Sequence, residues 1–140
     1  MSALERVARY LVVKQLADLG YVVDFIYAYF SGGSLGDAQR FGLSKTCARG
    51  YVQRIIEYCN GSFFRARAIV RHVYRFVKQL EPVILRIDGV ARCTICGAEL
   101  VPHHHVLQEH VARRHPDRVD DAVEKVIDAV VRSVKRVSNA

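Results

Sequence analysis

The spacing of two cysteines and two histidines constrains this 140-residue chain more than any other feature. Cys93 and Cys96 form a Cys-x-x-Cys pair, thirteen residues separate Cys96 from His110, and four residues separate His110 from His115. Two thiolates on a turn between strands and two imidazoles about one helical turn apart can close a tetrahedron around Zn²⁺. Because all four positions would be filled by protein, the pattern predicts a structural zinc site with no open position for catalysis.

The residues around this pattern predict a hairpin followed by a helix. Val83–Ile87 and Val90–Cys93 are rich in residues that favour strands, and Asp88-Gly89 between them is a strong hairpin turn signal. Pro102 is expected in the first turn of the helix that carries the two histidines. Residues 82–116 are therefore expected to form a small module of their own.

Residues 90–116 resemble the two-Cys, two-His family of zinc fingers. Leu100 and Leu107 stand where this family places its small hydrophobic core. The resemblance implies a ββα fold in which the metal replaces a core that is too small to hold itself together.

The resemblance also indicates where such a module would read DNA. The base-reading positions of the family fall on His103, Val106 and Glu109, a set that contains no Lys or Arg. We therefore expect a structural or docking role for this module. The alternative is DNA contact through Arg113, Arg114 and His103.

The positive charge of the chain is confined to one segment. The formal net charge is +7 at pH 7, and residues 31–80 hold nine Lys or Arg against two acidic residues. Acids and bases balance in the rest of the chain. A concentrated basic excess is typical of a surface that binds a polyanion. A solvated basic face without a partner is the alternative that charge alone leaves open.

Residues 34–58, SLGDAQRFGLSKTCARGYVQRIIEY, resemble the helix-turn-helix family of DNA-binding proteins. Ala38 stands where the first helix passes close to the second, and Gly42 can adopt the positive φ of the tight turn. Ser44 is expected to cap the second helix, which runs to about Cys59. A helical hairpin with a purely structural role is the alternative.

The resemblance implies double-stranded DNA as the partner and the second helix as the one that enters the major groove. The residues expected to face outward for DNA contact are Ser44, Lys45, Thr46, Arg49 and Gln53. The next predicted helix, residues 63–80, carries bases expected to neutralise phosphates: Arg65, Arg67, Arg71 and Arg75. Neutralising about six to ten phosphates would lower the affinity by roughly 10³–10⁵ between 50 and 200 mM salt.

The whole chain is predicted to be mainly α, with a helical domain over residues 1–81, the zinc-finger module over 82–116 and a C-terminal helix over 117–140. Residues 21–30 are apolar throughout, so periodicity does not decide between a helix and a strand there. The C-terminal helix has a seam of β-branched residues: Val123, Ile127, Val130, Val134 and Val137. This seam either packs on residues 3–30 or pairs two chains into a homodimer through residues 117–138, which we expect.

Two function classes remain open at this stage. The first is a DNA-binding transcription regulator of the cytoplasm, because the chain has no long apolar run and no signal peptide pattern. The second is a protein-interaction adaptor, or RNA-binding module, without sequence-specific DNA binding. No paired carboxylates, nucleophile triad or phosphate-binding glycine loop stands out, so neither enzymatic activity nor a small-molecule substrate is expected. The combination of modules is similar to proteins of archaea and archaeal viruses.

Overall fold

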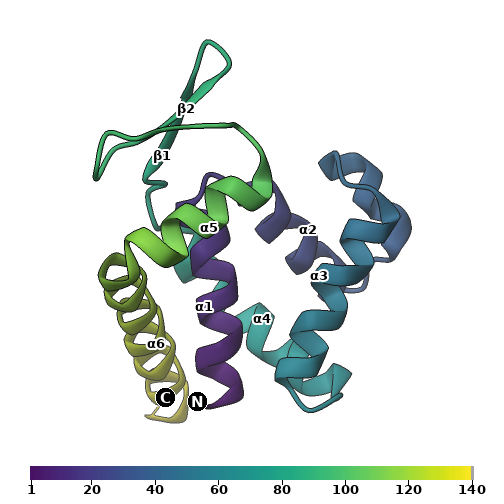
Figure 1. Cartoon of the computed structure of the whole chain (residues 1–140). Helices are drawn as coiled ribbons and strands as arrows, with labels where there is room; N and C mark the ends of the chain where they lie inside the picture. Colours follow the sequence, from purple (N-terminus) through teal and green to yellow (C-terminus); the bar gives the residue numbers. More distant parts are fainter. Residues whose placement is uncertain (140) are drawn as a thin grey trace.

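The computed structural model describes the backbone of residues 1–139 and the side chains of residues 1–135. Helices make up most of it, and a small antiparallel sheet projects from one end (Figure 1). The helices are α1 (Ala3–Leu16), α2 (Gly20–Phe30), the 3₁₀ helix η1 (Leu35–Phe41), α3 (Lys45–Tyr58), α4 (Phe63–Lys78), α5 (His104–Arg114) and α6 (Pro116–Asn139). The strands are β1 (Ile84–Ile87), β2 (Val90–Cys93) and β3 (Glu99–Leu100), in the order β1-β2-β3. The prediction of a mainly helical chain is therefore confirmed.

Helix α1 lies at the centre of the molecule and packs against every other α-helix (Figure 1). Its apolar residues recur at helical spacing, and Val7, Leu11 and Val12 are completely buried. The second half of α1 is covered on its polar side as well, because α3 and α5 also pack against it. Lys14 and Gln15 are consequently buried, and Gln15 Nε2 donates a hydrogen bond to the Leu80 carbonyl at 3.1 Å.

Residues 20–30, for which the sequence left open a helix or a strand, form the helix α2. Phe25, Ile26 and Phe30 are fully buried on one side of α2. On another side, Asp24 accepts a 2.7 Å hydrogen bond from the Tyr74 hydroxyl of α4. The Tyr27 ring stacks on Tyr74 with 3.9 Å between ring centroids. The helical period places these polar and aromatic groups together against α4, whereas the alternation of a strand would separate them.

The first helix of the segment 34–58 is present, but it is wound more tightly than an α-helix. It is the 3₁₀ helix η1, and Ser34 and Asp37 form a reciprocal capping box at its start. Gly42 then adopts φ +74°, as the turn signal predicted, and Ala38 is buried. The Ser44 hydroxyl accepts a 3.1 Å hydrogen bond from the Cys47 N–H, so Ser44 caps α3 as expected.

The hairpin has the predicted position but gains a third strand. Asp88 and Gly89 both adopt positive φ at the turn, and Ile87 pairs with Val90 beside it. Strand β3 pairs with β2 through Arg92 and Glu99, so the sheet has one strand more than the expected ββα arrangement.

The helix after the sheet starts later than predicted. Pro102 precedes α5 instead of lying in its first turn, because the chain stays extended through β3 and then turns at the hydrogen bond from the His103 N–H to the Val101 carbonyl. His103 is the N-cap residue of α5.

Helix α6 begins at Pro116, at the position in a first turn that tolerates a missing N–H. Val123 and Val130 of the predicted seam are buried and Ile127 is partly buried, because α6 packs against α1 and α4. Val134 is exposed, and the side chain of Val137 lies outside the described residues. Most of the seam is therefore used inside the chain.

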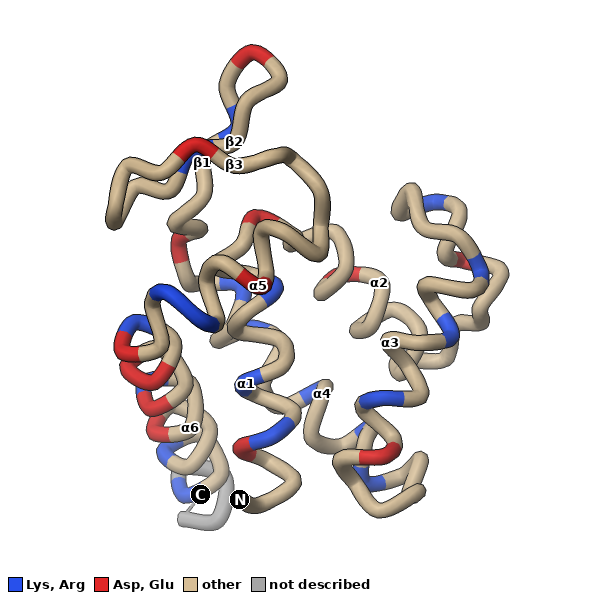
Figure 2. Tube along the Cα trace, viewed as in Figure 1, with Lys and Arg blue, Asp and Glu red and all other residues tan. Residues whose placement is uncertain are grey.

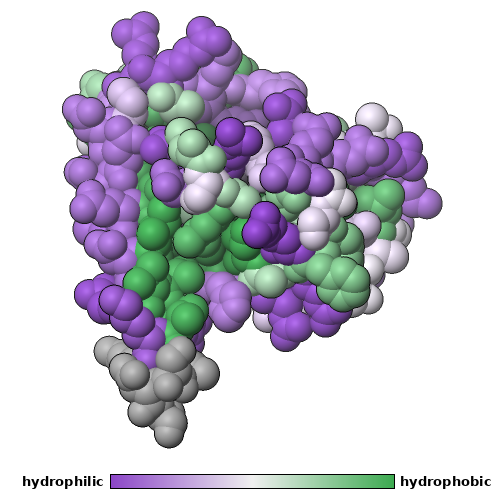
Figure 3. All heavy atoms as spheres, turned by 90° about the horizontal axis from the view of Figure 1, so that it is seen from below, coloured by the Kyte–Doolittle hydropathy of each residue, from purple (hydrophilic) through white to green (hydrophobic). Residues whose placement is uncertain are grey.

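Seen from the end where the termini of α1 and α6 meet, apolar side chains form a band at the surface (Figure 3). Exposed apolar residues at the ends of these two helices include Met1, Val131 and Val134. No helix in residues 1–139 combines the length and the apolar character needed to cross a bilayer.

Candidate metal centre and nucleic-acid interface

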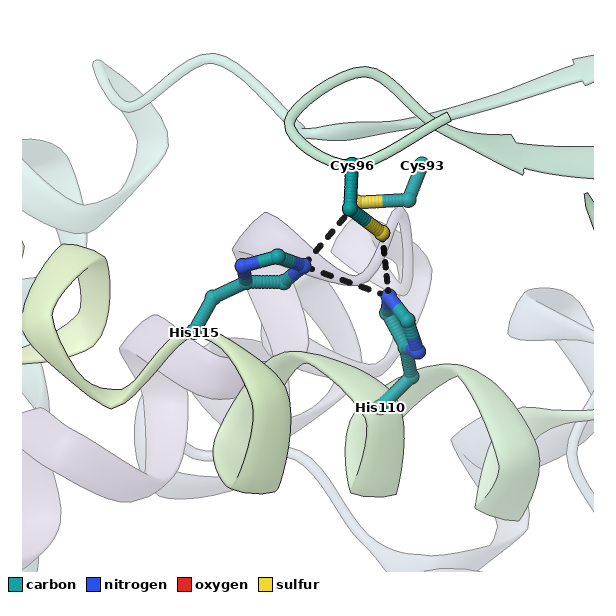
Figure 4. Close-up of side chains that lie close together, drawn as sticks. All are labelled: Cys93, Cys96, His110 and His115. Carbon is teal, nitrogen blue, oxygen red and sulfur yellow. Dashed lines mark hydrogen bonds between the residues drawn. The ribbon is translucent and has the colours of Figure 1, made fainter. Parts of the chain in front are cut away.

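The two cysteines and two histidines singled out by their spacing converge at one point (Figure 4). Each offers one ligand atom, and the four ligand atoms all lie within 4.8 Å of one another. Cys93 Sγ lies 3.3 Å from His115 Nε2, and Cys96 Sγ lies 3.4 Å from His110 Nε2. The two Nε2 atoms are 3.3 Å apart. These groups could together hold a metal ion.

The distances fit a small tetrahedral cation. With metal–nitrogen bonds of about 2.0–2.1 Å and metal–sulfur bonds of about 2.3 Å, tetrahedral ligands lie about 3.3–3.8 Å apart. The three contacts of 3.3–3.4 Å between ligand atoms fall within this range, and all the ligand atoms lie within 4.8 Å of one another. Two imidazole nitrogens and two sulfurs all turned toward one point are the arrangement that a tetrahedral cation needs.

The sheet side of the site is positioned by a tight knuckle. Cys93 ends β2, and its N–H and carbonyl are bonded to the Ala98 carbonyl at 2.9 Å and the Gly97 N–H at 2.8 Å. Gly97 adopts φ +76°, which a residue with a Cβ rarely does. The backbone N–H and the side-chain hydroxyl of Thr94 both donate to the Val83 carbonyl, at 2.8 and 2.9 Å, and fix the knuckle on the strand before it.

The helix side of the site combines one helical and one non-helical residue. His110 lies within α5, whereas His115 follows its last residue and has φ −130° and ψ 49°. This change of backbone direction lets two residues five positions apart face the same point. Burial, followed by the charges of His115 and Arg114, lowers the pKa of His110 and so favours the neutral imidazole, which is the form that binds metals.

The sheet and α5, here called the hairpin unit (residues 83–115), share one continuous core with the helices. Leu107 and Val111 of α5 are completely buried in the same cluster as α1, and Leu100 packs against it. The Val83 N–H donates to the Leu16 carbonyl at 2.9 Å, and Arg86 pairs with Asp18 at 3.2 Å. The metal site is thereby held directly against α1.

Of the residues predicted to contact DNA from the second helix of the helix-turn-helix pattern, four lie on one face of α3 and Ser44 is its N-cap residue. All are exposed: Ser44, Lys45, Thr46, Arg49 and Gln53. Ala48, Val52 and Ile55 on the opposite face are buried. Figure 2 shows Lys and Arg positions along α3, whereas many of the acidic positions lie on α6.

The four arginines predicted on α4 do not share one environment. Arg65 and Arg71 are exposed, and Arg67 is half-buried. Arg67 and Arg71 border a shallow cavity of about 530 Å³ beside the exposed ring of Phe64. Arg75 instead lies over the Phe76 ring and donates a 2.8 Å hydrogen bond to Ser133 of α6. This hydrogen bond helps to hold α6 against α4.

The positions of α5 that correspond to base-reading residues are exposed. His103, Val106 and Glu109 all face solvent, and Glu109 pairs with Arg113 at 2.9 Å. Arg114 is also exposed. This surface carries one ion pair and little unpaired positive charge, unlike the face of α3.

Lys14 is a residue that the sequence pattern did not single out. Only 3% of its surface is exposed, and its Nζ donates a 2.9 Å hydrogen bond to Gln108 Oε1 of α5. Burial and then the charge of Arg54 lower its pKa to about 7. The sequence of α1 does not indicate that Lys14 is buried, because Lys14 lies outside its apolar stripe. The residues that cover Lys14 come from α3 and α5, far along the chain.

Comparisons with protein-family models, with curated proteins and with solved structures found no match to this chain. The assignment of a function therefore depends on the geometry and chemistry of the sites themselves.

Proposed function

We propose that this protein binds double-stranded DNA through the outward face of α3 and regulates transcription, with a structural Zn²⁺ holding its hairpin unit. The observation that carries the proposal is the exposed, acid-free face at the start of α3. Lys45 and Arg49 lie one turn apart on it, with Thr46 beside them. Lys and Arg suit guanine edges, and Thr suits a base edge or a phosphate.

The surface of α3 beside Arg49 is open at Gly50. Gly50 follows Arg49 on α3, and a methyl group at its Cα would meet no atom within 4 Å. Gln53, one turn further, is exposed and suits adenine. The acid of α3, Glu57, lies in its last turn, 4.0 Å from Arg54, and so leaves the first two turns positive.

The metal is proposed to be zinc because of the donor set. Two thiolates with two imidazoles in a tetrahedron are typical of structural Zn²⁺ sites, and all the coordination positions would be filled by protein. The ion would therefore fold the hairpin unit and would not catalyse a reaction.

DNA selected from random sequences tests the proposal, with affinity measured by fluorescence anisotropy. The double variant Lys45→Ala, Arg49→Ala is expected to weaken binding by about tenfold to several hundredfold, since a good base contact contributes about 1–3 kcal/mol. The matched control, Arg86→Ala with Arg92→Ala, removes two exposed bases of the hairpin sheet, outside α3 and α6, and should bind normally. Unchanged affinity of the first variant, or an affinity that does not fall with salt, contradicts the proposal.

A protein-interaction adaptor is the second candidate, favoured by a different observation. The hairpin unit exposes large apolar side chains on its strands and on the segment that follows: Leu85, Ile87, Val90 and Val101. Exposed apolar groups gathered on a projecting hairpin are typical of a protein contact. Failure of every selected DNA to bind at low salt would favour this candidate over the first.

We also propose a homodimer through residues 117–138, as is common for helix-turn-helix proteins that bind two half-sites. Since α6 already buries Val123 and Val130 within the chain, the contact would use its exposed valines, Val131 and Val134. The change Val134→Lys should then shift the mass in light scattering at micromolar concentration from dimer to monomer. A monomer mass for the unchanged protein contradicts the dimer.

A further inference from the structure

A cavity of about 610 Å³ lies between α1, α3 and α5, apart from the metal centre and from the outward face of α3. Arg6, Arg9, Tyr10 and Lys14 line it from α1, with Tyr58 from α3 and Gln108 from α5. None of the side chains that line it is acidic. The cavity is therefore a positively charged hollow with aromatic walls.

Lys14 gives this cavity an unsatisfied cationic group. Its Nζ has three N–H donors when charged, and within the described residues Gln108 Oε1 is its one hydrogen-bond acceptor. The other neighbours of Nζ are the faces of two rings, with the Tyr10 centroid at 3.6 Å and the Tyr51 centroid at 5.0 Å. No carboxylate of the described residues lies within ion-pair distance of Nζ. Without a counter-ion such a buried amine readily loses its proton, and a bound anion would hold it in the charged form.

The two arginines of the cavity also have donor groups without acidic partners. Arg9 pairs with Asp120 at 2.8 Å through one terminal nitrogen, while its Nε is buried and has no hydrogen-bond partner among the described residues. Arg6 is exposed beside it and is in no ion pair within the described residues. Burial and the charge of Arg54 also lower the pKa of Lys14. These observations together indicate a site that lacks negative charge.

The remaining walls suit a flat apolar body. The rings of Tyr10 and Tyr58 meet edge to face, with centroids 5.7 Å apart and planes at 72°. Val13 adds an aliphatic surface to the same cavity. Aromatic walls with a few convergent polar groups are typical of sites for small molecules.

We propose that this cavity binds a small anion with an aromatic body, its carboxylate or phosphate paired with Lys14 and Arg6 and its ring against Tyr10 and Tyr58. The site does not depend on the proposed DNA binding, because none of its residues belongs to the outward face of α3. A ligand there would touch α1, α3 and α5 at once.

Isothermal titration calorimetry of the full chain tests this site with three probes: salicylate, adenosine 5′-monophosphate and inorganic phosphate. We expect binding of salicylate or of the nucleotide at a single site, and the one that binds tells whether the head group is a carboxylate or a phosphate. Lys14→Met and Arg6→Gln should each weaken it by about tenfold or more, as expected for the loss of a hydrogen bond to a charged group. Lys125→Met, the same change at an exposed position of α6, should leave it unchanged.

Several results would overturn the proposal. It is wrong if neither aromatic anion binds, or if both cavity variants bind like the unchanged protein. It is also wrong if inorganic phosphate binds as tightly as the aromatic anions, since the tyrosine walls would then contribute nothing. Arg6→Gln changes an exposed side chain, so its result stands even if Lys14→Met disturbs the core.

Discussion

The helical part of the chain and the hairpin unit bury apolar side chains to different extents. Helices α1 and α2 contribute large, completely buried residues such as Leu11, Phe25 and Phe30. In the hairpin unit Ile84 and Leu107 are buried, but other large side chains such as Ile87 and Val101 are 64% and 66% exposed. The helical part can be held by burial alone, whereas the hairpin unit needs another source of stability, which the four converging ligands can supply.

Removal of the metal should have the largest effect and should separate the two regions. Structural zinc sites contribute about 10–16 kcal/mol of apparent binding free energy at neutral pH. Cys93→Ser is therefore expected to abolish stoichiometric zinc and to disorder the hairpin unit, while α1 and α2 keep their helical signal. Metal analysis and amide hydrogen exchange measure the two effects.

The matched control for this change is Cys47→Ser. Cys47 is exposed on α3 and takes no part in the ligand cluster, so zinc content and exchange should be unchanged. If amide hydrogen exchange of the hairpin unit is equally slow with and without metal, the hairpin unit does not depend on the metal for its stability.

Truncation of a core aromatic should have the next largest effect, on the helical part. Phe25 is completely buried and packs edge to face with Phe41, with ring centroids 6.0 Å apart. Phe25→Ala should lower the free energy of unfolding by about 3–5 kcal/mol in urea denaturation. Phe64→Ala, the same change at a ring that is 82% exposed, should alter it by less than about 0.5 kcal/mol. Similar losses in the two variants would argue against the core assigned to α2.

The sequence predicted the hairpin unit better than it predicted the centre of the helical part. The ligand spacing and the Asp88-Gly89 turn are local signals, and the structure confirms that the four residues cluster and that the hairpin turns there. Strand β3 was missed because its two residues, Glu99 and Leu100, are too few for any periodicity to be visible. The burial of Lys14 was missed because it results from helices α3 and α5, which cover α1 from distant parts of the chain.

Lys14 offers the smallest and most specific test, because it lies where the helical part meets the hairpin unit. Its pKa is lowered from 10.5 to about 7, so between these values the unfolded state binds more protons than the folded state. The stability of the protein should therefore rise with pH across this window. The neighbouring Tyr51 stays protonated there, since burial raises its pKa to about 12.

Lys14→Met removes this penalty and should stabilise the protein by about 1–3 kcal/mol near pH 7.5, with a smaller gain near pH 9.5. Urea denaturation of the zinc-loaded protein at both pH values measures the difference. The arginines near Lys14, Arg6, Arg9 and Arg54, are present in both proteins. Burial, followed by the charges of His105, His103 and Lys14, lowers the pKa of His104, so His104 is neutral at both pH values and does not contribute to the difference. A gain that grows with pH would mean that burial does not lower the pKa of Lys14.

His115 is both a ligand of the candidate metal centre and the corner at which α5 gives way to α6. Its carbonyl accepts the first hydrogen bond of α6, from the Val119 N–H at 3.2 Å, while its imidazole faces the cysteines. A metal bound by His115 would thus fix the point at which the chain turns from α5 into α6. Loss of the ion would therefore act first at this corner, whereas the packing of α6 on α1 and α4 would remain.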